Sequence, residues 1–261
     1  MIDNPASHSP APLSSPRTWL VPALTATMAL VIAGLDANRE LFLWLNDWSR
    51  SHAGAAFWAN ATILGDTLVA LSLLGLFARK RPDIVWALLI AALFATAWVH
   101  VLKPLLVHPR PLSVLGADAV NVIGVELFYR SFPSGHTATA FTLAGVILLR
   151  GVHPALAGIA LLLATLAGVS RAVVGAHWPL DILAGAFGGW LAAVIGVALG
   201  RKWTVPTGRG AQAAIALLLL ASGLALLLWH DVQYPARGLQ MGIGVISVLT
   251  VGSYLFQLYR R

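Results

Sequence analysis

Long stretches without a charged side chain alternate with short polar connections along the chain. A hydrocarbon core about 30 Å thick needs about 20 helical residues to cross it. Six uncharged stretches are long enough, and they are residues 18–35, 84–102, 154–170, 182–200, 211–229 and 238–259. The pattern therefore predicts an all-α protein, a polytopic transmembrane helical bundle.

Two further apolar stretches are shorter. Residues 67–78 and 137–149 reach spanning length only by accepting a polar group at one end. That group is Asp66 for the first stretch and a Ser-Gly-His turn for the second. Counting both, we predict eight spans, which form a six-span core followed by a C-terminal two-span hairpin.

The chain shows no repeat of fixed period, and we expect one membrane domain without a soluble partner domain. Residues 1–16 are rich in Pro, Ser and Ala and are predicted to be a disordered tail. Residues 17–202 form the predicted core and residues 203–261 the C-terminal hairpin. We interpret the hairpin as a packing or dimerisation element, or as a part that shapes the route by which a lipid reaches the core.

The connection over residues 36–60 contains an amphipathic pattern. Leu41, Trp44, Leu45 and Trp48 recur at the spacing of one helix face. With tryptophan at headgroup depth, a helix lying on the outer surface of the membrane is one interpretation. A loop packed on the bundle is the other, and the sequence does not choose between them.

Composition agrees with a membrane protein. Apolar residues make up 58% of the chain and charged residues 10%, against about 25% charged in soluble domains. The net charge of +7 raises the question of nucleic-acid binding. With a cytoplasmic N-terminus and eight alternating spans, Lys and Arg divide ten to seven in favour of the cytoplasm, as the positive-inside rule requires. We therefore expect no nucleic-acid partner, both termini in the cytoplasm, and insertion in the plasma (bacterial inner) membrane.

Ionisable groups lie at helix ends in two outer connections, over about residues 103–132 and 171–179. The first connection contributes two segments. In "KPLLVHPRP", Lys103 offers a point charge and Arg110 a planar fork suited to phosphate. In "PSGH", Ser134 can cap the next helix, Gly135 permits close approach of a ligand, and His136 can donate a proton. A helix N-terminus of this kind is also an anion site. Each segment alone is as typical of a membrane anchor or a helix cap.

A third segment, "SRAVVGAHWPLD", adds Arg171, His177 and Asp181. His177 lies just before the sixth span, and Asp181 lies in its first turn, where the helix dipole favours a carboxylate. The offset of four residues lets the carboxylate reach the imidazole. A carboxylate on one ring nitrogen fixes the tautomer and leaves the other nitrogen free as a nucleophile.

Together the three segments resemble a known family. Lys-x6-Arg-Pro, then Pro-Ser-Gly-His, then Ser-Arg-x5-His-x3-Asp is similar to the signature of the type 2 phosphatidic acid phosphatase superfamily, in its integral membrane lipid phosphatase branch. All three parts occur in order and with the family's spacing, and the resemblance covers about residues 35–201.

The resemblance implies a role for each matched position. His177 is the expected nucleophile that forms a phosphohistidine, Asp181 orients it, and His136 is the general acid for the leaving oxygen. Lys103, Arg110 and Arg171 are expected to hold the phosphate oxygens, together with Ser134 and the backbone N–H of Gly135. Three cations neutralise the transferred phosphoryl group here, so we expect no metal and no other cofactor. The remaining histidines, at positions 8, 52, 100, 108, 153 and 230, are assigned no role.

We therefore expect a membrane lipid phosphatase whose active site faces the periplasm or exterior. Its substrate is a lipid phosphate, either a polyprenyl diphosphate such as undecaprenyl diphosphate or a phosphatidate or phosphatidylglycerophosphate. The alternatives are a lipid phosphotransferase, a lipid A-type phosphatase and, in another class, a transporter or binding protein with a degenerate site. We expect the loop over residues 112–132 to lie over the site, and it is a candidate for substrate selection. The sequence does not predict the oligomeric state.

Overall fold

The computed structural model describes residues 13–52 and 54–260, and this part of the chain is helical without a β-strand. The predicted disordered tail lies mostly outside the described residues. The all-α class is confirmed. In chain order the elements are α1 (Pro16–Gly34), α2 (Asn38–His52), α3 (Ala55–Ile63), α4 (Thr67–Leu74), the 3-10 turn η1 (Gly75–Phe77), α5 (Pro82–Leu105), α6 (Pro111–Leu115), α7 (Gly135–Leu149), α8 (Pro154–Val173), α9 (Pro179–Lys202), α10 (Arg209–Leu228) and α11 (Arg237–Arg260).

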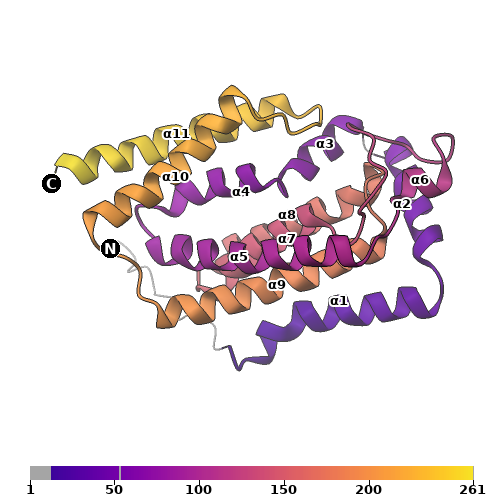
Figure 1. The fold of residues 1–261 in the computed structure, drawn as a ribbon, viewed down its shortest axis with the longest axis horizontal. Coiled ribbons are helices and arrows are strands. Elements are labelled where there is room, and N and C mark those ends of the chain that lie inside the picture. Colours follow the sequence, from indigo (N-terminus) through magenta and orange to yellow (C-terminus); the bar gives the residue numbers. More distant parts are fainter. Residues whose placement is uncertain (1–12, 53, 261) are drawn as a thin grey trace.

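Six helices of the described chain are long and apolar enough to cross a membrane. They are α1, α5, α8, α9, α10 and α11, and they match the six long uncharged stretches to within a few residues. These six helices run along the length of the molecule (Figure 1). The predicted long helices are thus confirmed.

The two shorter stretches take other forms. Helix α3 and the α4–η1 pair are apolar enough together, but they bend by 64° at the break between them. Asp66 starts α4 at this break, because its Oδ1 accepts hydrogen bonds from the backbone N–H groups of Leu68 and Val69. Helix α7 has 15 residues, fewer than the roughly 17 that a straight crossing needs. Within the described residues, the eight predicted spans therefore correspond to six long helices, one broken pair and one short helix.

Residues 38–52 form a helix, α2, and not a loop. The packed face differs from the predicted apolar face, since Phe42 and Asn46 are buried while Trp44 is 61% exposed. The amide nitrogen of Asn46 donates to the carbonyl oxygens of Asn121 and Val173, both at 2.9 Å. Hydrophobic spacing could not reveal this face because a polar side chain at its centre is satisfied by distant backbone groups.

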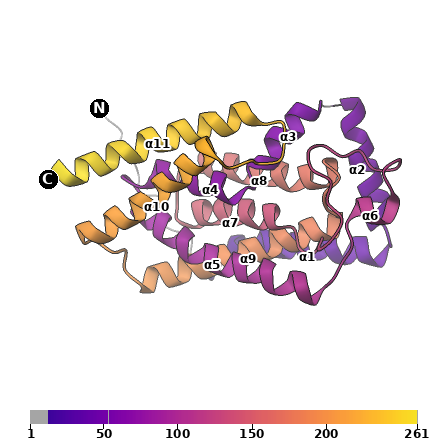
Figure 2. The ribbon, with the colours of Figure 1, turned by 45° about the horizontal axis from the view of Figure 1, so that its top comes forward.

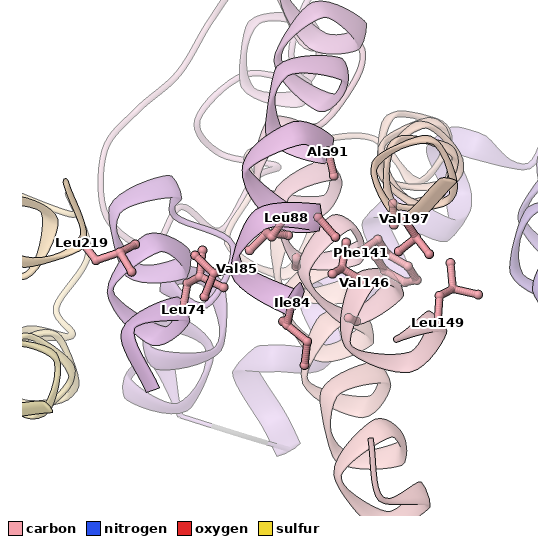
Figure 3. Packing of buried hydrophobic residues seen from close by; sticks show 14 of the residues in the cluster. Leu74, Ile84, Val85, Leu88, Ala91, Phe141, Val146, Leu149, Val197 and Leu219 are labelled. Carbon is pink, nitrogen blue, oxygen red and sulfur yellow. The ribbon is translucent and has the colours of Figure 1, made fainter. Parts of the chain in front are cut away.

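One cluster of buried apolar side chains connects the central helices. Figure 3 shows Leu74 of α4, Val85 of α5, Phe141 of α7, Val197 of α9 and Leu219 of α10 within it. Helix α7 packs on α9, α5, α8 and α4, so it occupies the centre of the bundle. The central position explains why the short α7 needs no polar surface along its length.

Helices α7 and α9 approach closely through glycines. A Cβ added at Gly185 would lie 2.5 Å from the carbonyl oxygen of Ser134, and one added at Gly189 would overlap the backbone of Ala138. Small residues at helix contacts allow this approach in membrane bundles, where apolar burial alone does not bring helices together. The contact also fixes the start of α7 against the first turns of α9.

Helices α10 and α11 form the predicted C-terminal hairpin. They pack on each other and on α4, along one side of the bundle (Figures 1 and 2). Their connection, residues 229–236, lies at the end of the molecule that also holds α3 and the loop after α6 (Figures 1 and 2). That end carries the candidate site.

Candidate active site

The side chains predicted from the three segments meet at one end of the bundle. Lys103 lies in the last turn of α5, and Arg110 is the residue before α6. His136 lies in the first turn of α7, and Arg171 lies in the last turn of α8. His177 and Asp181 flank the start of α9. The ends of five helices thus position the six side chains.

Arg110 is held by backbone carbonyl groups. Its Nε donates to the carbonyl oxygen of Tyr129 at 2.8 Å, and its Nη1 donates to that of Ala176 at 2.9 Å. The side chain is buried. Neutral carbonyl partners orient the guanidinium without cancelling its charge. Arg110 is therefore an oriented cation.

The imidazole of His177 lies between this cation and Asp181. Its Nε2 is 3.4 Å from Nη1 of Arg110, and its Nδ1 is 3.5 Å from Oδ2 of Asp181. A guanidinium can only donate hydrogen bonds, so Nε2 must be the acceptor and Nδ1 must carry the proton. This tautomer leaves a lone pair on Nε2 facing the cation, which is the state that a nucleophilic imidazole requires.

Asp181 is itself fixed by two donors. Its Oδ2 accepts hydrogen bonds from the hydroxyl of Ser131 at 2.5 Å and from the backbone N–H of Trp178 at 2.9 Å. The Ser131 oxygen also lies 3.4 Å from Nδ1 of His177. Since its proton goes to the carboxylate, this oxygen is free to accept from Nδ1–H. Ser131 therefore belongs to the hydrogen-bond network that orients His177.

The electrostatic surroundings keep His177 neutral. Burial lowers the pKa of His177 well below its usual range, and the positive charges of Arg110 and Arg171 act in the same direction. The pKa of Arg110 is lowered to about 10, first by burial and then by Arg171. Arg110 thus stays charged at neutral pH while His177 stays unprotonated.

The start of α7 is attached directly to Asp181. The backbone N–H of Ser134 donates to the carbonyl oxygen of Asp181 at 3.0 Å. The Ser134 hydroxyl accepts hydrogen bonds from the backbone N–H and the hydroxyl of Thr137, so it caps the helix as expected. Gly135 and His136 of the same turn line a cavity together with Lys103.

Arg171 is one of the largest fully buried side chains in the described chain. Its Nη1 donates to the hydroxyl oxygens of Thr62 at 2.6 Å and Tyr234 at 2.9 Å. Its Nε is buried and has no hydrogen-bond partner among residues 13–52 and 54–260. A buried donor without a partner requires an explanation, and a bound anion is one.

A cavity of about 220 Å³ leads away from the site between α4, α5 and α7. Lys103 and His136 line it beside Asp66, and its deeper walls are apolar, with Leu71, Leu88 and Leu143 among them. The cavity therefore joins a cationic end to an apolar interior. This is the shape that suits a ligand with a charged head and a hydrocarbon tail.

Four residues near the site were not found from the sequence. They are Ser131, Thr62, Asp66 as a wall of the cavity, and Tyr234. Ser131, Thr62 and Tyr234 occur singly outside the three motifs, so no spacing marked them. Within the described residues, no group of three or more His, Cys, Asp or Glu side chains could hold a metal ion.

Comparison with known proteins identifies the same family as the three motifs. The family model of the PAP2 superfamily matches residues 84–204. The crystal structure of Aquifex aeolicus LpxE superposes with a TM-score of 0.55 at 35% identity, over 64% of this chain and 95% of that one. The bacitracin transport permease protein BcrC of Bacillus licheniformis is 40% identical over 180 residues, which cover 66% of this chain and 82% of that protein.

A lipid A 1-phosphatase of Rhizobium etli is 40% identical over 76 residues. This alignment covers 28% of the present chain and only 31% of that relative's length. The fold and the candidate site thus define a helical membrane protein that gathers histidines and cations at one end of its bundle. The chain belongs to the PAP2 superfamily, as the three motifs predict.

Proposed function

We propose that the protein is a membrane lipid phosphatase that removes a phosphate group through a phosphohistidine intermediate. The observation that carries the proposal is the orientation of His177. Its Nε2 faces the guanidinium of Arg110 at 3.4 Å, and its Nδ1 faces Asp181 and Ser131. A neutral imidazole whose Nε2 lone pair points at oriented cations is suited to attack phosphorus once a phosphoryl group binds there and takes over the hydrogen bond of Arg110.

The first step forms the intermediate. Nε2 of His177 attacks the phosphorus, and the bond from phosphorus to the leaving oxygen breaks, which is the lipid oxygen of a monoester or the bridging oxygen of a diphosphate. His136 gives a proton to that leaving oxygen, which keeps its electron pair. Asp181 stabilises the positive charge that develops on the imidazole ring.

The second step releases phosphate. Water attacks the phosphorus of the phosphohistidine, and neutral His136 takes a proton from the water. The phosphorus–nitrogen bond breaks, and His177 regains its lone pair. Both steps place negative charge on the same three phosphate oxygens, where Lys103, Arg110 and Arg171 supply positive charge. The proposed reaction needs no metal for this purpose.

We further propose how the site is reached from the membrane. The broken α3–α4 pair and the short α7 complete eight crossings, and the site faces the periplasm or exterior. The apolar cavity between α4, α5 and α7 supports the entrance of a lipid from the side, with its head at Lys103 and His136. The hydrocarbon tail remains between the helices.

Candidate substrates are membrane lipids with an accessible phosphate. The named activity of the Rhizobium etli relative supports a phosphorylated saccharolipid. The motifs suit a polyprenyl diphosphate or a phosphorylated glycerolipid equally well. A phosphotransferase would share the intermediate and differ only in the acceptor. The relative from Bacillus licheniformis is named a transport permease, so the alternative of a transporter is considered as well.

The test is phosphate release by the purified full chain in the presence of EDTA. The substrates are undecaprenyl diphosphate, phosphatidate, phosphatidylglycerophosphate and lipid A. We expect release from at least one of them, and a loss of about 10³-fold or more in His177→Ala, because a covalent step without its nucleophile is lost. His153→Ala removes an exposed histidine at the start of α8 and should retain full activity.

Three results would count against the proposal. They are the absence of phosphate release from every lipid, full activity of His177→Ala, and loss of activity on chelation. Transfer of phosphate to a second lipid without release to water would support the phosphotransferase instead.

A further inference from the structure

The connection between α10 and α11 lies against the active site. It belongs to the C-terminal hairpin, which begins after the residues matched by the family model, 84–204. Two of its side chains contact residues of the site region. Tyr234 contacts Arg171, and His230 contacts Asp66. The hairpin therefore does more than pack along the side of α4.

Tyr234 contacts the phosphate-site residue Arg171 in two ways. Its hydroxyl oxygen accepts a hydrogen bond from Nη1 at 2.9 Å, and the guanidinium carbon lies 5.4 Å from the centre of its ring. Arginine has no acceptor, so the phenolic proton is not used in this bond. Thr62 is the second acceptor of the same nitrogen.

The chemistry of these two partners preserves the charge of Arg171. Thr62 and Tyr234 are neutral hydroxyls, and no carboxylate within 4 Å pairs with Arg171 in the described part of the chain. A carboxylate in their place would neutralise the cation before phosphate binds. The hydroxyls instead fix the direction of the guanidinium and leave its positive charge available.

The ring of Tyr234 is also fixed. It is 9% exposed and packs in a cluster with Val173, Val174 and Ala176, which lie between Arg171 and His177 in the chain. Gly124, with φ +89°, brings the loop after α6 against it, because a Cβ at Gly124 would lie 2.5 Å from the carbonyl oxygen of Gln233. That loop carries Ser131.

Other contacts fix the ends of the connection. Nε2 of His230 lies 3.0 Å from Oδ2 of Asp66, the residue that starts α4 and lines the cavity beside His136. The buried amide of Gln240 donates to the carbonyl oxygens of His230 and Leu226, both at 2.7 Å. The position of the Tyr234 hydroxyl is thus determined by contacts on both sides of it.

The geometry points to Tyr234 as a positioning residue of the phosphate site. Its hydroxyl holds Arg171 in the direction in which the arginine binds a phosphoryl oxygen, and the C-terminal hairpin is the part of the fold that supplies it. This inference rests on the proposed function, since it takes Arg171 as a phosphate ligand. It adds a role to the hairpin that the three motifs do not contain.

The test uses Tyr234→Phe, which removes the hydroxyl and keeps the ring and its packing. The probe is orthovanadate, an inorganic analogue of the transferring phosphoryl group, and its binding to the purified full chain is measured by titration calorimetry. We expect binding about tenfold weaker than in the wild type, because the guanidinium of Arg171 is then no longer held in its binding direction by a hydrogen bond.

A matched control exists in the same hairpin. The hydroxyl of Tyr254 donates to the side-chain oxygen of Gln212 at 2.9 Å, between α10 and α11. Tyr254→Phe therefore removes a comparable hydrogen bond away from Arg171. It should bind orthovanadate like the wild type, and both variants should keep thermal-unfolding midpoints close to each other without ligand.

The outcomes separate this inference from the proposed function. If Tyr234→Phe binds orthovanadate as tightly as the wild type does, the positioning role of Tyr234 is wrong. The phosphatase proposal is not affected by that result. Equal weakening in Tyr254→Phe also overturns it, since the effect would then be a general loosening of the hairpin. Failure of the wild type to bind orthovanadate contradicts the phosphate site itself, and the inference is rejected with it.

Discussion

At the scale of single residues, the site depends on keeping one histidine uncharged among cations. His177 is buried beside Arg110, and Asp181 and Ser131 hold its protonated nitrogen. Burial and the neighbouring charges both oppose a second proton on the ring. The cations that we propose to bind phosphate therefore also keep the proposed nucleophile uncharged.

The pH dependence of activity should show this effect. Because the pKa of His177 is lowered, its neutral form persists as the pH falls through about 6.5, the ordinary value for histidine. We expect the acid limb of kcat/KM to lie below that pH in the wild type. Arg110→Gln removes one opposing charge, so the acid limb of its residual activity should move to higher pH.

The control for this experiment is Arg237→Gln, which removes an exposed arginine at the start of α11. Its acid limb should coincide with that of the wild type. An acid limb at or above pH 6.5 in the wild type would contradict the assigned state of His177, as would a downward shift in Arg110→Gln.

At the scale of elements, the start of α7 is positioned by its contact with α9. Gly185 lies against the carbonyl oxygen of Ser134, and the N–H of Ser134 donates to Asp181. Any side chain at Gly185 must push the two helices apart. The proposed general acid on α7 and the proposed nucleophile before α9 would then lose their relative position.

Gly185→Ala should therefore reduce kcat/KM by about tenfold or more, with a stability loss of roughly 1–3 kcal/mol from overpacking. The measurements are phosphate release and the thermal-unfolding midpoint. Gly158→Ala in α8 is the matched control, since a Cβ at Gly158 meets no atom within 4 Å. The control should behave like the wild type. Unchanged activity in Gly185→Ala would show that the helices can separate without cost.

At the scale of the whole molecule, the two ends of the bundle differ in chemistry. One end holds the proposed site and the loop after α6. The other holds an ion-pair cluster in which Asp83 binds Arg81 at 2.9 Å and Arg150 at 2.8 Å. The proposed topology places the first end outside the cell and the second in the cytoplasm, as the distribution of Lys and Arg predicts.

Cysteine labelling tests this topology, because the chain has no cysteine of its own. Asp118→Cys places a thiol on the exposed loop after α6, and Lys202→Cys places one at the exposed end of α9. In intact cells, a membrane-impermeant maleimide should label the first variant and leave the second unlabelled until the membrane is permeabilised. The reverse pattern would contradict the proposed orientation.

Much of the fold follows from the sequence because it depends on local chemistry. Uncharged stretches of spanning length must form helices in a bilayer, since unpaired backbone groups are too costly there. The six long helices, the cap at Ser134 and the offset between His177 and Asp181 are all set by residues close together in the chain. The three motifs likewise name most of the candidate site, because each contains the end of at least one helix that borders it.

Contacts between distant segments were decided only by the tertiary structure. The face by which α2 packs depends on Asn46 reaching carbonyl groups of α8 and the loop after α6. Ser131 and Tyr234 enter the site through hydrogen bonds to partners 50 and 63 residues away along the chain. A serine or tyrosine satisfied by such a partner leaves no periodic signal in the sequence. Short segments of the sequence thus determine which chemical groups the candidate site contains. The orientation of the proposed nucleophile and of Arg171 is determined by how the helices pack.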